Sequence, residues 1–260
     1  MKTLFKSILK YYLKYITKLA LLIHRPFIIG VSGSINVVFV KDEIGRQLAM
    51  LNYEVRSNPK NFNTEIGLPL AILNLPSGYN LYKKWLPIIW QAGKSIFTLK
   101  LPKILVLGLG ISCPGDMKYL LSLVKPKIAV ITDITQRYLE SFEDMDELVG
   151  EYEMFAKSIP SGGYLILNYD NERIKKLSEL TKNKTFFFSL KENRDKIKNY
   201  WQGSVLEKSN LGQRVRVLSD GLAAGDYEIK NFGQHHLYAF LCGVIVKKII
   251  LNPPYEVPEG

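Results

Sequence analysis

The residues from Phe27 to Asp42, FIIGVSGSINVVFVKD, join an apolar run to a turn of small residues. The apolar run, Phe27 to Val31, predicts a strand, and the turn at Ser32 to Ser34 leads into a second apolar segment that we expect to be helical. Backbone N–H groups at the start of such a helix point outward and can bind an anion. The stretch therefore predicts the backbone of a phosphate-binding loop.

The side chains of this loop do not match its backbone. A loop that binds ATP has the pattern GxxxxGK[ST], in which the Lys contacts the β- and γ-phosphates and the hydroxyl binds Mg²⁺. Gly30 begins such a pattern here, but its second glycine, its lysine and its hydroxyl fall on Asn36, Val37 and Val38. The sequence thus predicts a loop that has the frame for a phosphate and lacks the groups that bind it.

Composition limits the function classes. The chain has 260 residues, 35 of them basic and 24 acidic, which gives a net charge of +11. Residues 1–25 contain six of the basic residues and no acidic one, so the excess is concentrated in one segment and does not favour nucleic-acid binding by the rest of the chain. Two cysteines, Cys113 and Cys242, do not form a disulfide framework and favour a reducing compartment.

Residues 2–23 predict a basic amphipathic helix. Its lysines recur every fourth residue and occupy one half of a helical wheel, with apolar side chains on the other half. The longest unbroken apolar run, Leu19 to Ile23, is far shorter than the roughly 20 residues of a membrane span, and no signal-peptide cleavage site follows. Two interpretations stay open: the helix lies on an anionic membrane surface, or it packs on its own domain with solvated lysines.

From Ile28 onward, apolar runs typical of buried strands alternate with helical segments. This order predicts an α/β fold with a mostly parallel sheet flanked by helices, and a small antiparallel edge near the C-terminus. We expect three parts: the helix at 1–25, one domain at 26–252 and a tail at 253–260. The expected strands are Phe27–Val31, Ile104–Leu109, Ile128–Ile134, Tyr164–Asn168, Thr185–Ser189, Gln213–Leu218 and Asp226–Lys230. The expected helices after the loop are Pro114–Leu123, Glu143–Lys157, Glu172–Leu180 and Leu237–Ile250.

Five motifs in this order resemble the central ATP-binding domain of the Mur ligase family. The resemblance covers roughly residues 25–250 and is greatest to the type that adds D-alanyl-D-alanine to the peptidoglycan precursor. It is carried by Gly30–Ser34 with Lys41-Asp42, Asn61–Pro69 (NFNTEIGLP), Pro114–Asp116, Pro160–Asp170 (PSGGYLILNYD) and Gly233–Tyr238 (GQHHLY). It implies a nucleotide-binding fold of the P-loop kind that activates a carboxylate with ATP and Mg²⁺ before an amine attacks.

The sequence departs from that family where the chemistry takes place. The resemblance implies a lysine and a threonine at Val37 and Val38, and a Mg²⁺-binding glutamate at Gly108. It also implies a metal-binding histidine at Tyr138, a carbamylated lysine at Glu151 and an asparagine at His236. Apolar side chains in place of cations leave a bound anion uncompensated. We also expect the chain to lack the N-terminal and C-terminal domains of a full ligase.

Our hypothesis is a pseudoenzyme, with no catalytic residue, no metal ligand and no cofactor, although the family uses ATP and Mg²⁺. The former nucleotide site is expected at Gly30, Gly33, Ser34, Asn36, Lys41, Asn168, Asp170 and His236, and a substrate-binding segment at Asn61, Asn63 and Thr64. We expect a cytoplasmic protein, peripheral at the inner membrane face if residues 2–23 bind lipid, with a Mur ligase or another cell-wall enzyme as partner and no nucleic acid.

Two alternatives remain open for the site. The chain is an active ligase, alone or completed by a partner, or the cleft binds a small molecule without phosphate because Val37, Val38 and Phe39 make it apolar. The acidic residues Asp116, Asp133, Glu140 and Glu151 form either a weak cation site at the sheet edge or solvated loop positions. We expect Trp85 and Trp90 to pack a helix onto the sheet or to line a partner surface.

Overall fold

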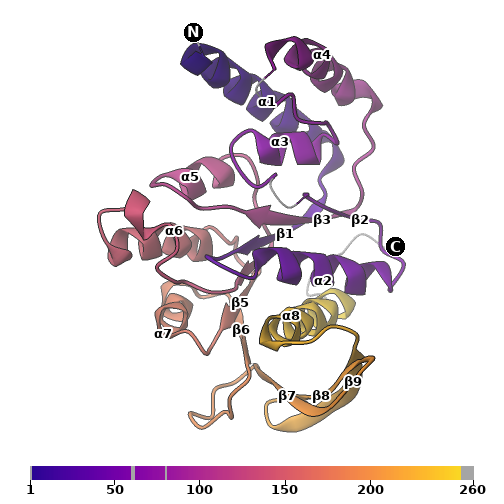
Figure 1. Ribbon diagram of the computed structural model, residues 1–260, viewed down its shortest axis with the longest axis vertical. Helices are drawn as coiled ribbons and strands as arrows, with labels where there is room; N and C mark the ends of the chain where they lie inside the picture. Colours follow the sequence, from indigo (N-terminus) through magenta and orange to yellow (C-terminus); the bar gives the residue numbers. More distant parts are fainter. Residues whose placement is uncertain (1, 60–61, 80, 253–260) are drawn as a thin grey trace.

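The computed structural model describes residues 2–59, 62–79 and 81–252 (Figure 1). These residues form a nine-stranded sheet with the strand order β2-β3-β1-β4-β5-β6-β7-β8-β9. Strands β1 to β7 are parallel, and β8 runs antiparallel to both β7 and β9. The strands are β1 (Phe27–Ser32), β2 (Val55–Ser57), β3 (Ile104–Leu109), β4 (Ile128–Ile131), β5 (Tyr164–Asn168), β6 (Lys184–Ser189), β7 (Tyr200–Ser209), β8 (Gly212–Ser219) and β9 (Leu222–Ile229). The expected mostly parallel sheet with an antiparallel edge is confirmed.

Helices cover both faces of this sheet (Figure 1). They are α1 (Lys2–His24), α2 (Val37–Ala49), α3 (Gly67–Ile72), α4 (Tyr82–Thr98), α5 (Asp116–Leu121), α6 (Met145–Lys157), α7 (Glu172–Lys175) and α8 (Gln234–Leu251), with 3₁₀ turns at Leu139–Ser141 and Lys176–Leu180. Neighbouring residues of β3 point to opposite faces, as a pleated strand requires. Leu105 packs with α5 and α6, whereas Ile104 packs with α2 and α8. The buried strands thus separate two apolar cores.

A third apolar cluster joins α1, α3 and α4 at one end of the molecule. Leu9 and Leu13 of α1 pack there with Trp85 and Ile88 of α4, and all four side chains are buried. The interpretation of α1 as a helix packed on its own domain therefore holds for this side of the helix. The expectation that the two tryptophans pack a helix onto the sheet is wrong, because Trp85 lies in this third cluster and Trp90 is 68% exposed.

Several predicted boundaries differ from the structure. The strand expected to end at Ile134 ends at Ile131, because the chain then turns toward the loop that follows β1. Strand β7 was not predicted, and β8 and β9 are longer than expected. The helix expected to end at Leu180 is α7 followed by a 3₁₀ turn. Within the described ranges, no helix is both long and apolar enough to cross a membrane.

Candidate functional site

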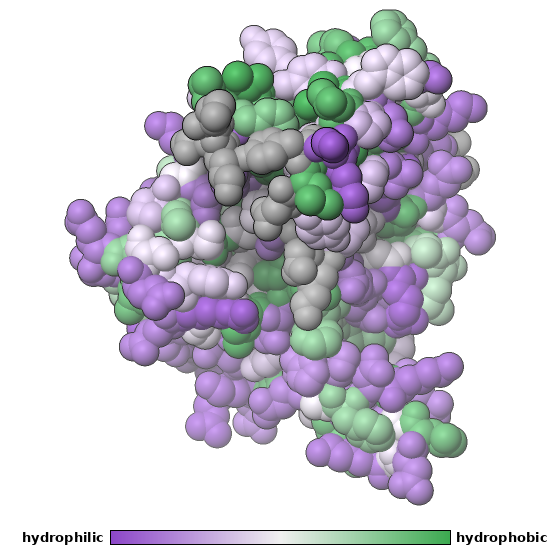
Figure 2. All heavy atoms as spheres, turned by 45° about the horizontal axis from the view of Figure 1, so that its top comes forward, coloured by the Kyte–Doolittle hydropathy of each residue, from purple (hydrophilic) through white to green (hydrophobic). Residues whose placement is uncertain are grey.

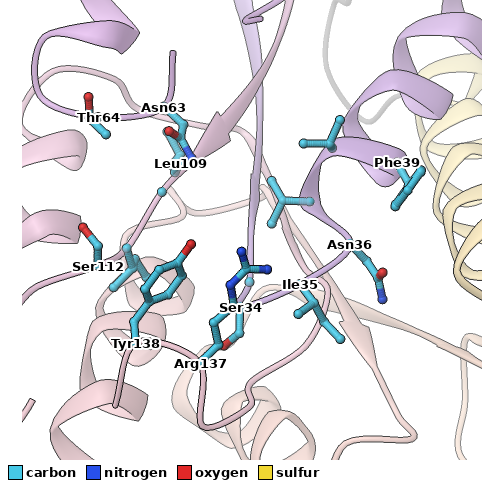
Figure 3. Close-up of a pocket in the computed structure, with 15 residues that line it drawn as sticks. Ser34, Ile35, Asn36, Phe39, Asn63, Thr64, Leu109, Ser112, Arg137 and Tyr138 are labelled. Carbon is cyan, nitrogen blue, oxygen red and sulfur yellow. The ribbon is translucent and has the colours of Figure 1, made fainter. Parts of the chain in front are cut away.

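A cavity of about 630 Å³ lies at the carboxyl ends of β1 and β3, where ligands of open α/β sheets bind. Its walls come from the loop after β1 and the start of α2, the segment before α3, the loop after β3 and the segment before the first 3₁₀ turn. The lining residues are Gly33 to Phe39, Asn63, Thr64, Leu109 to Ser112, Arg137 and Tyr138. Figure 3 shows Arg137 and Tyr138 extending into the space beside Ser34. Of the predicted site residues, Gly33, Ser34, Asn36, Asn63 and Thr64 meet here.

The first half of the loop is fastened to the end of β4. The Ser34 N–H donates to the Asp133 carbonyl at 2.8 Å, and the Thr132 hydroxyl donates to the Ile35 carbonyl at 2.6 Å. Gly33 has a φ of +156°, and a Cβ there would overlap the Thr132 hydroxyl oxygen. The close approach of β4 therefore requires glycine at this position.

The Ser34 side chain is also bound within the protein. Its hydroxyl accepts the Thr135 N–H at 3.0 Å and lies 3.4 Å from the Tyr152 hydroxyl. Burial raises the pKa of Tyr152 to about 12, so this phenol stays protonated near neutral pH. Both polar groups of Ser34 thus hold the loop in place.

The second half of the loop leaves backbone N–H groups open at the start of α2. Helix α2 begins at Val37 after Asn36, which has a left-handed φ of 66° and makes no side-chain cap. Within the described part of the chain, no protein acceptor binds the N–H groups of residues 35–39. Exposed N–H groups at a helix start carry partial positive charge. The backbone frame predicted from the sequence is therefore present.

At two positions where the resemblance implies charged side chains, the loop and the end of β3 have an apolar residue and a glycine that pack together. A Cβ added to Gly108 would lie 3.3 Å from Val37 Cγ1 and 3.6 Å from Asn58 Oδ1. Asn58 holds Gly108 from the other side: its Oδ1 accepts the Gly108 N–H at 2.7 Å, and its Nδ2 donates to the Gly108 carbonyl at 3.1 Å. Val37 and Gly108 are the positions where the resemblance implies a lysine and a metal-binding glutamate. Here they form one packed contact.

Lys41 does not supply the missing cation. Its side chain is only 4% exposed, and its ammonium donates to the Asn58 carbonyl at 2.5 Å and to Asp42 at 2.6 Å. It lies behind the loop and does not line the cavity. The charged side chain that does line it is Arg137, which sequence reasoning missed; it has no acidic partner within the described residues. The only sequence signal for Arg137 is its place next to Tyr138.

Two of the four acidic side chains predicted near the sheet edge serve the fold. Glu151 is buried, and its two carboxylate oxygens accept the N–H groups of Gly115 at 2.8 Å and Met117 at 2.7 Å. Asp116 accepts the N–H groups of Ser112 and Cys113. Among the residues that the structure describes, no group of three or more His, Cys, Asp and Glu side chains could hold a metal ion. Glu151 and Asp116 thus stabilise the turn that leads into α5.

Asn168 and Asp170 brace the end of β5. The Asn168 amide donates to the Thr132 carbonyl at 2.9 Å, next to the loop after β1. Asp170 accepts hydrogen bonds from the hydroxyls of Ser189 and Tyr238, each at 2.7 Å. Burial, followed by the hydrogen bond to Asp170, raises the pKa of Tyr238. These two predicted nucleotide residues join β5, β6 and α8, and neither lines the cavity.

The remaining predicted residues are dispersed. His236 packs against Phe39, with ring centroids 5.0 Å apart, and Figure 3 shows Phe39 turned toward α8. Gly30 contacts α6, since a Cβ there would lie 2.8 Å from Phe155. Asn61 lies outside the described residues. Nucleotide or substrate binding by any of the predicted residues stays a prediction.

Comparison with known proteins shows which family the chain resembles. A model of the Mur ligase middle domain matches residues 90–246. A UDP-N-acetylmuramate–L-alanine ligase of Alkaliphilus metalliredigens is 23% identical over 231 residues, which cover 78% of this chain and 49% of that protein. A UDP-N-acetylmuramoylalanine–D-glutamate ligase of Staphylococcus aureus is 30% identical over 126 residues, 48% of this chain and 27% of that protein.

Solved structures show the same fold. MurF ligase from Thermotoga maritima in complex with ADP superposes with a TM-score of 0.71 at 18% identity, covering 95% of this chain and 51% of that one. MurF from Acinetobacter baumannii superposes with a TM-score of 0.70 at 16% identity, covering 92% and 46%. The chain thus spans about half, or less, of the length of the relatives it matches.

Proposed function

Because the chain belongs to the Mur ligase family through its middle domain, we propose that it is a Mur-ligase-type domain that has lost ATP-dependent amide ligation. The proposal assigns it a binding or scaffold role in peptidoglycan precursor synthesis. The observation that supports it is the packing of Val37 beside Gly108, the two positions where the resemblance implies a cation and a metal ligand.

Phosphoryl transfer explains why this contact matters. The reaction needs positive charge close to the transferring phosphate, supplied by a lysine and by metal ions. Val37 offers no charge, Lys41 is bound behind the loop, and Glu151 is engaged by backbone N–H groups. Removal of a single charge-stabilising donor lowers kcat about 10²- to 10³-fold in other enzymes, and several such groups are replaced here. The residues present do not fit a magnesium triphosphate.

We propose a cell-wall enzyme, such as a genuine Mur ligase, as the protein partner, and the cytoplasm as the location. A cytoplasmic location agrees with the two free cysteines, of which Cys113 is exposed and Cys242 buried.

Isothermal titration calorimetry of the full chain with ATP, in the presence and absence of Mg²⁺, tests the proposed loss of activity. We expect no Mg²⁺-dependent binding, and no release of phosphate when a UDP-muramoyl peptide and D-alanyl-D-alanine are added. Micromolar binding of MgATP with phosphate release from the purified chain would overturn the proposal.

A second candidate is a nucleotide site that another polypeptide completes. The free N–H groups at the start of α2 and the side chain of Arg137 favour it, because both face the cavity. This candidate predicts that ADP binds the isolated chain weakly and without Mg²⁺, and that Arg137→Gln abolishes the binding. Unchanged ADP binding by the Arg137→Gln variant would exclude Arg137 from such a site.

A further inference from the structure

Helices α1 and α4 both expose apolar side chains on the side that faces away from the sheet. On α4 the row consists of Leu86, Trp90 and Phe97, with exposed fractions of 70%, 68% and 88%. On α1 it consists of Leu4, Ile8, Tyr11, Tyr15 and Leu22, each at least 60% exposed. The spacing of three, four and seven residues places each row along one side of its helix. We call these two rows the α1–α4 face.

The two rows are parts of one surface. Tyr12 of α1 donates its hydroxyl to the Ile89 carbonyl of α4 at 2.8 Å. A Cβ at Gly93, which lies in the same row as Trp90 and Phe97, would be 3.0 Å from the Tyr12 hydroxyl. Tyr12 itself is a helical neighbour of Ile8 and Tyr15. Figure 2 shows apolar and aromatic side chains gathered over this end of the molecule.

The exposed rows are separate from the sides of α1 and α4 that pack on the domain. The opposite sides of both helices are already packed, through Leu9 and Leu13 on α1 and Trp85, Ile88 and Ala92 on α4. An amphipathic surface helix has one apolar side, which faces the core. These two helices each have a second one, and a continuous exposed apolar surface of this kind indicates an interaction site.

The net charge of the protein comes from the two segments that contain these helices, and Lys6 of the first segment pairs with Glu65 at 3.0 Å. Residues 1–25 and 81–103 contain no Asp or Glu, and the remainder of the chain carries as many basic as acidic residues, so these two segments account for the net charge of +11. Their basic residues are Lys2, Lys6, Lys10, Lys14, Lys18, Arg25, Lys83, Lys84, Lys94, Lys100 and Lys103. Lys94 lies 5.4 Å from the Trp90 ring, at the border of the apolar row.

We propose that the α1–α4 face binds the surface of an anionic lipid bilayer. Helices α1 and α4 then lie in the plane of the interface, with Trp90, Phe97 and the tyrosines among the headgroups and upper acyl chains and with lysines against the phosphates. Charge complementarity favours this occupant over a second copy of the chain, because two faces of the same strong positive charge repel each other.

Sedimentation of the full chain with vesicles tests the proposal. We expect sedimentation with vesicles of phosphatidylcholine and phosphatidylglycerol, and much less with phosphatidylcholine alone. The variant Lys83→Gln/Lys84→Gln/Lys94→Gln should bind at least tenfold more weakly, since one lysine near an anionic membrane is worth about fivefold. The matched control Lys198→Gln/Lys208→Gln/Lys230→Gln removes three exposed lysines elsewhere and should bind like the wild type.

The apolar contribution is tested in the same way. Trp90→Ser/Phe97→Ser should lose most of the binding, whereas Leu211→Ser/Leu222→Ser, which removes two exposed leucines from the β7–β9 edge, should not. Thermal unfolding of all four variants should match the wild type, because the substituted side chains are exposed.

Tryptophan fluorescence gives an independent readout. Trp85 and Trp201 are buried and Trp90 is exposed, so a blue shift on addition of anionic vesicles should come from Trp90 and be absent from Trp90→Phe. Equal binding to neutral vesicles, equal loss in test and control variants, or no binding to anionic vesicles would overturn the proposal. So would dimerisation through this face, or its capture by an acidic protein in the absence of lipid binding.

Discussion

The loop after β1 and the α1–α4 face differ in how they place apolar side chains. At the loop, Val37 packs over Gly108, and the polar groups of Ser34 and Lys41 are bound within the protein. At the α1–α4 face, Trp90 and Phe97 project into solvent with lysines beside them. Val37 thus occupies a position where a cation would bind phosphate, whereas exposed apolar side chains have an unfavourable free energy of hydration that a partner surface removes. We propose a lost function for the first region and membrane binding for the second.

The largest expected effect separates the two sides of α4. Trp85→Ala should lower the free energy of unfolding by about 3–5 kcal/mol, because it empties a buried site and removes the indole donor to the Tyr79 carbonyl. Trp90→Ala, five residues further on, should change it by less than about 0.5 kcal/mol. Chemical denaturation of both variants measures the difference. A loss of comparable size in Trp90→Ala would show that its side chain is packed and not part of an open face.

A second pair of residues tests whether the acids near the loop serve the fold. Glu151→Ala should cost about 2–4 kcal/mol, since it leaves the buried N–H groups of Gly115 and Met117 without an acceptor. Glu153→Ala on the same helix removes an exposed ion pair with Lys157 and should cost about 0.5 kcal/mol at most. Urea unfolding compares them. A different result would indicate a metal site at Glu151: the two variants are equally stable, and Mg²⁺ stabilises the wild type and Glu153→Ala but not Glu151→Ala.

A smaller effect on stability is expected from substitutions at Gly108 and Val37. Gly108→Ala places a methyl group 3.3 Å from Val37 Cγ1 and should destabilise the protein by about 1 kcal/mol through overpacking. Val37→Ala removes the neighbouring Cγ1, so Gly108→Ala should lower the free energy of unfolding by less when Val37→Ala is also present. A double-mutant cycle measures the coupling between the two positions. Strictly additive effects would mean that the two residues do not share the space.

The smallest effect concerns the side of the loop that faces α8. Burial, and then the charge of His235, lower the pKa of His236. The unfolded chain therefore binds more protons than the folded one, and stability should fall as the pH drops below about 6.5. His236→Gln should flatten this part of the profile of melting temperature against pH. A variant with the wild-type slope would show that His236 titrates alike in both states.

The sequence predicts much of the sheet and little of the site. Strands β1, β3 and β5 are continuous apolar runs, as expected of strands buried on both faces, and their positions were found. Strand β7 was missed because only its first residues are buried, and its second half exposes apolar and polar side chains without the alternation of a half-buried strand. Strand β2 has three residues, too few for a pattern.

The site depends on contacts between distant residues, which no local pattern encodes. Substitutions at Val37 and Gly108 were visible in the sequence, but their mutual packing required the register of β1 and β3. The same holds for Glu151, whose partners lie 36 and 34 residues away. The exposed row on α1 was not foreseen, because a helical wheel separates apolar from charged residues without showing which apolar side meets the core.

Paired calorimetric titrations with MgATP test the central claim most directly. The wild-type chain is compared with the variant Asn36→Gly/Val37→Lys/Val38→Thr, which restores the phosphate-binding side chains to the loop after β1. We predict no Mg²⁺-dependent binding by the wild type up to about 1 mM ATP, and binding at least about tenfold tighter by the variant. Micromolar MgATP binding by the wild type, unchanged in the variant, would contradict the account.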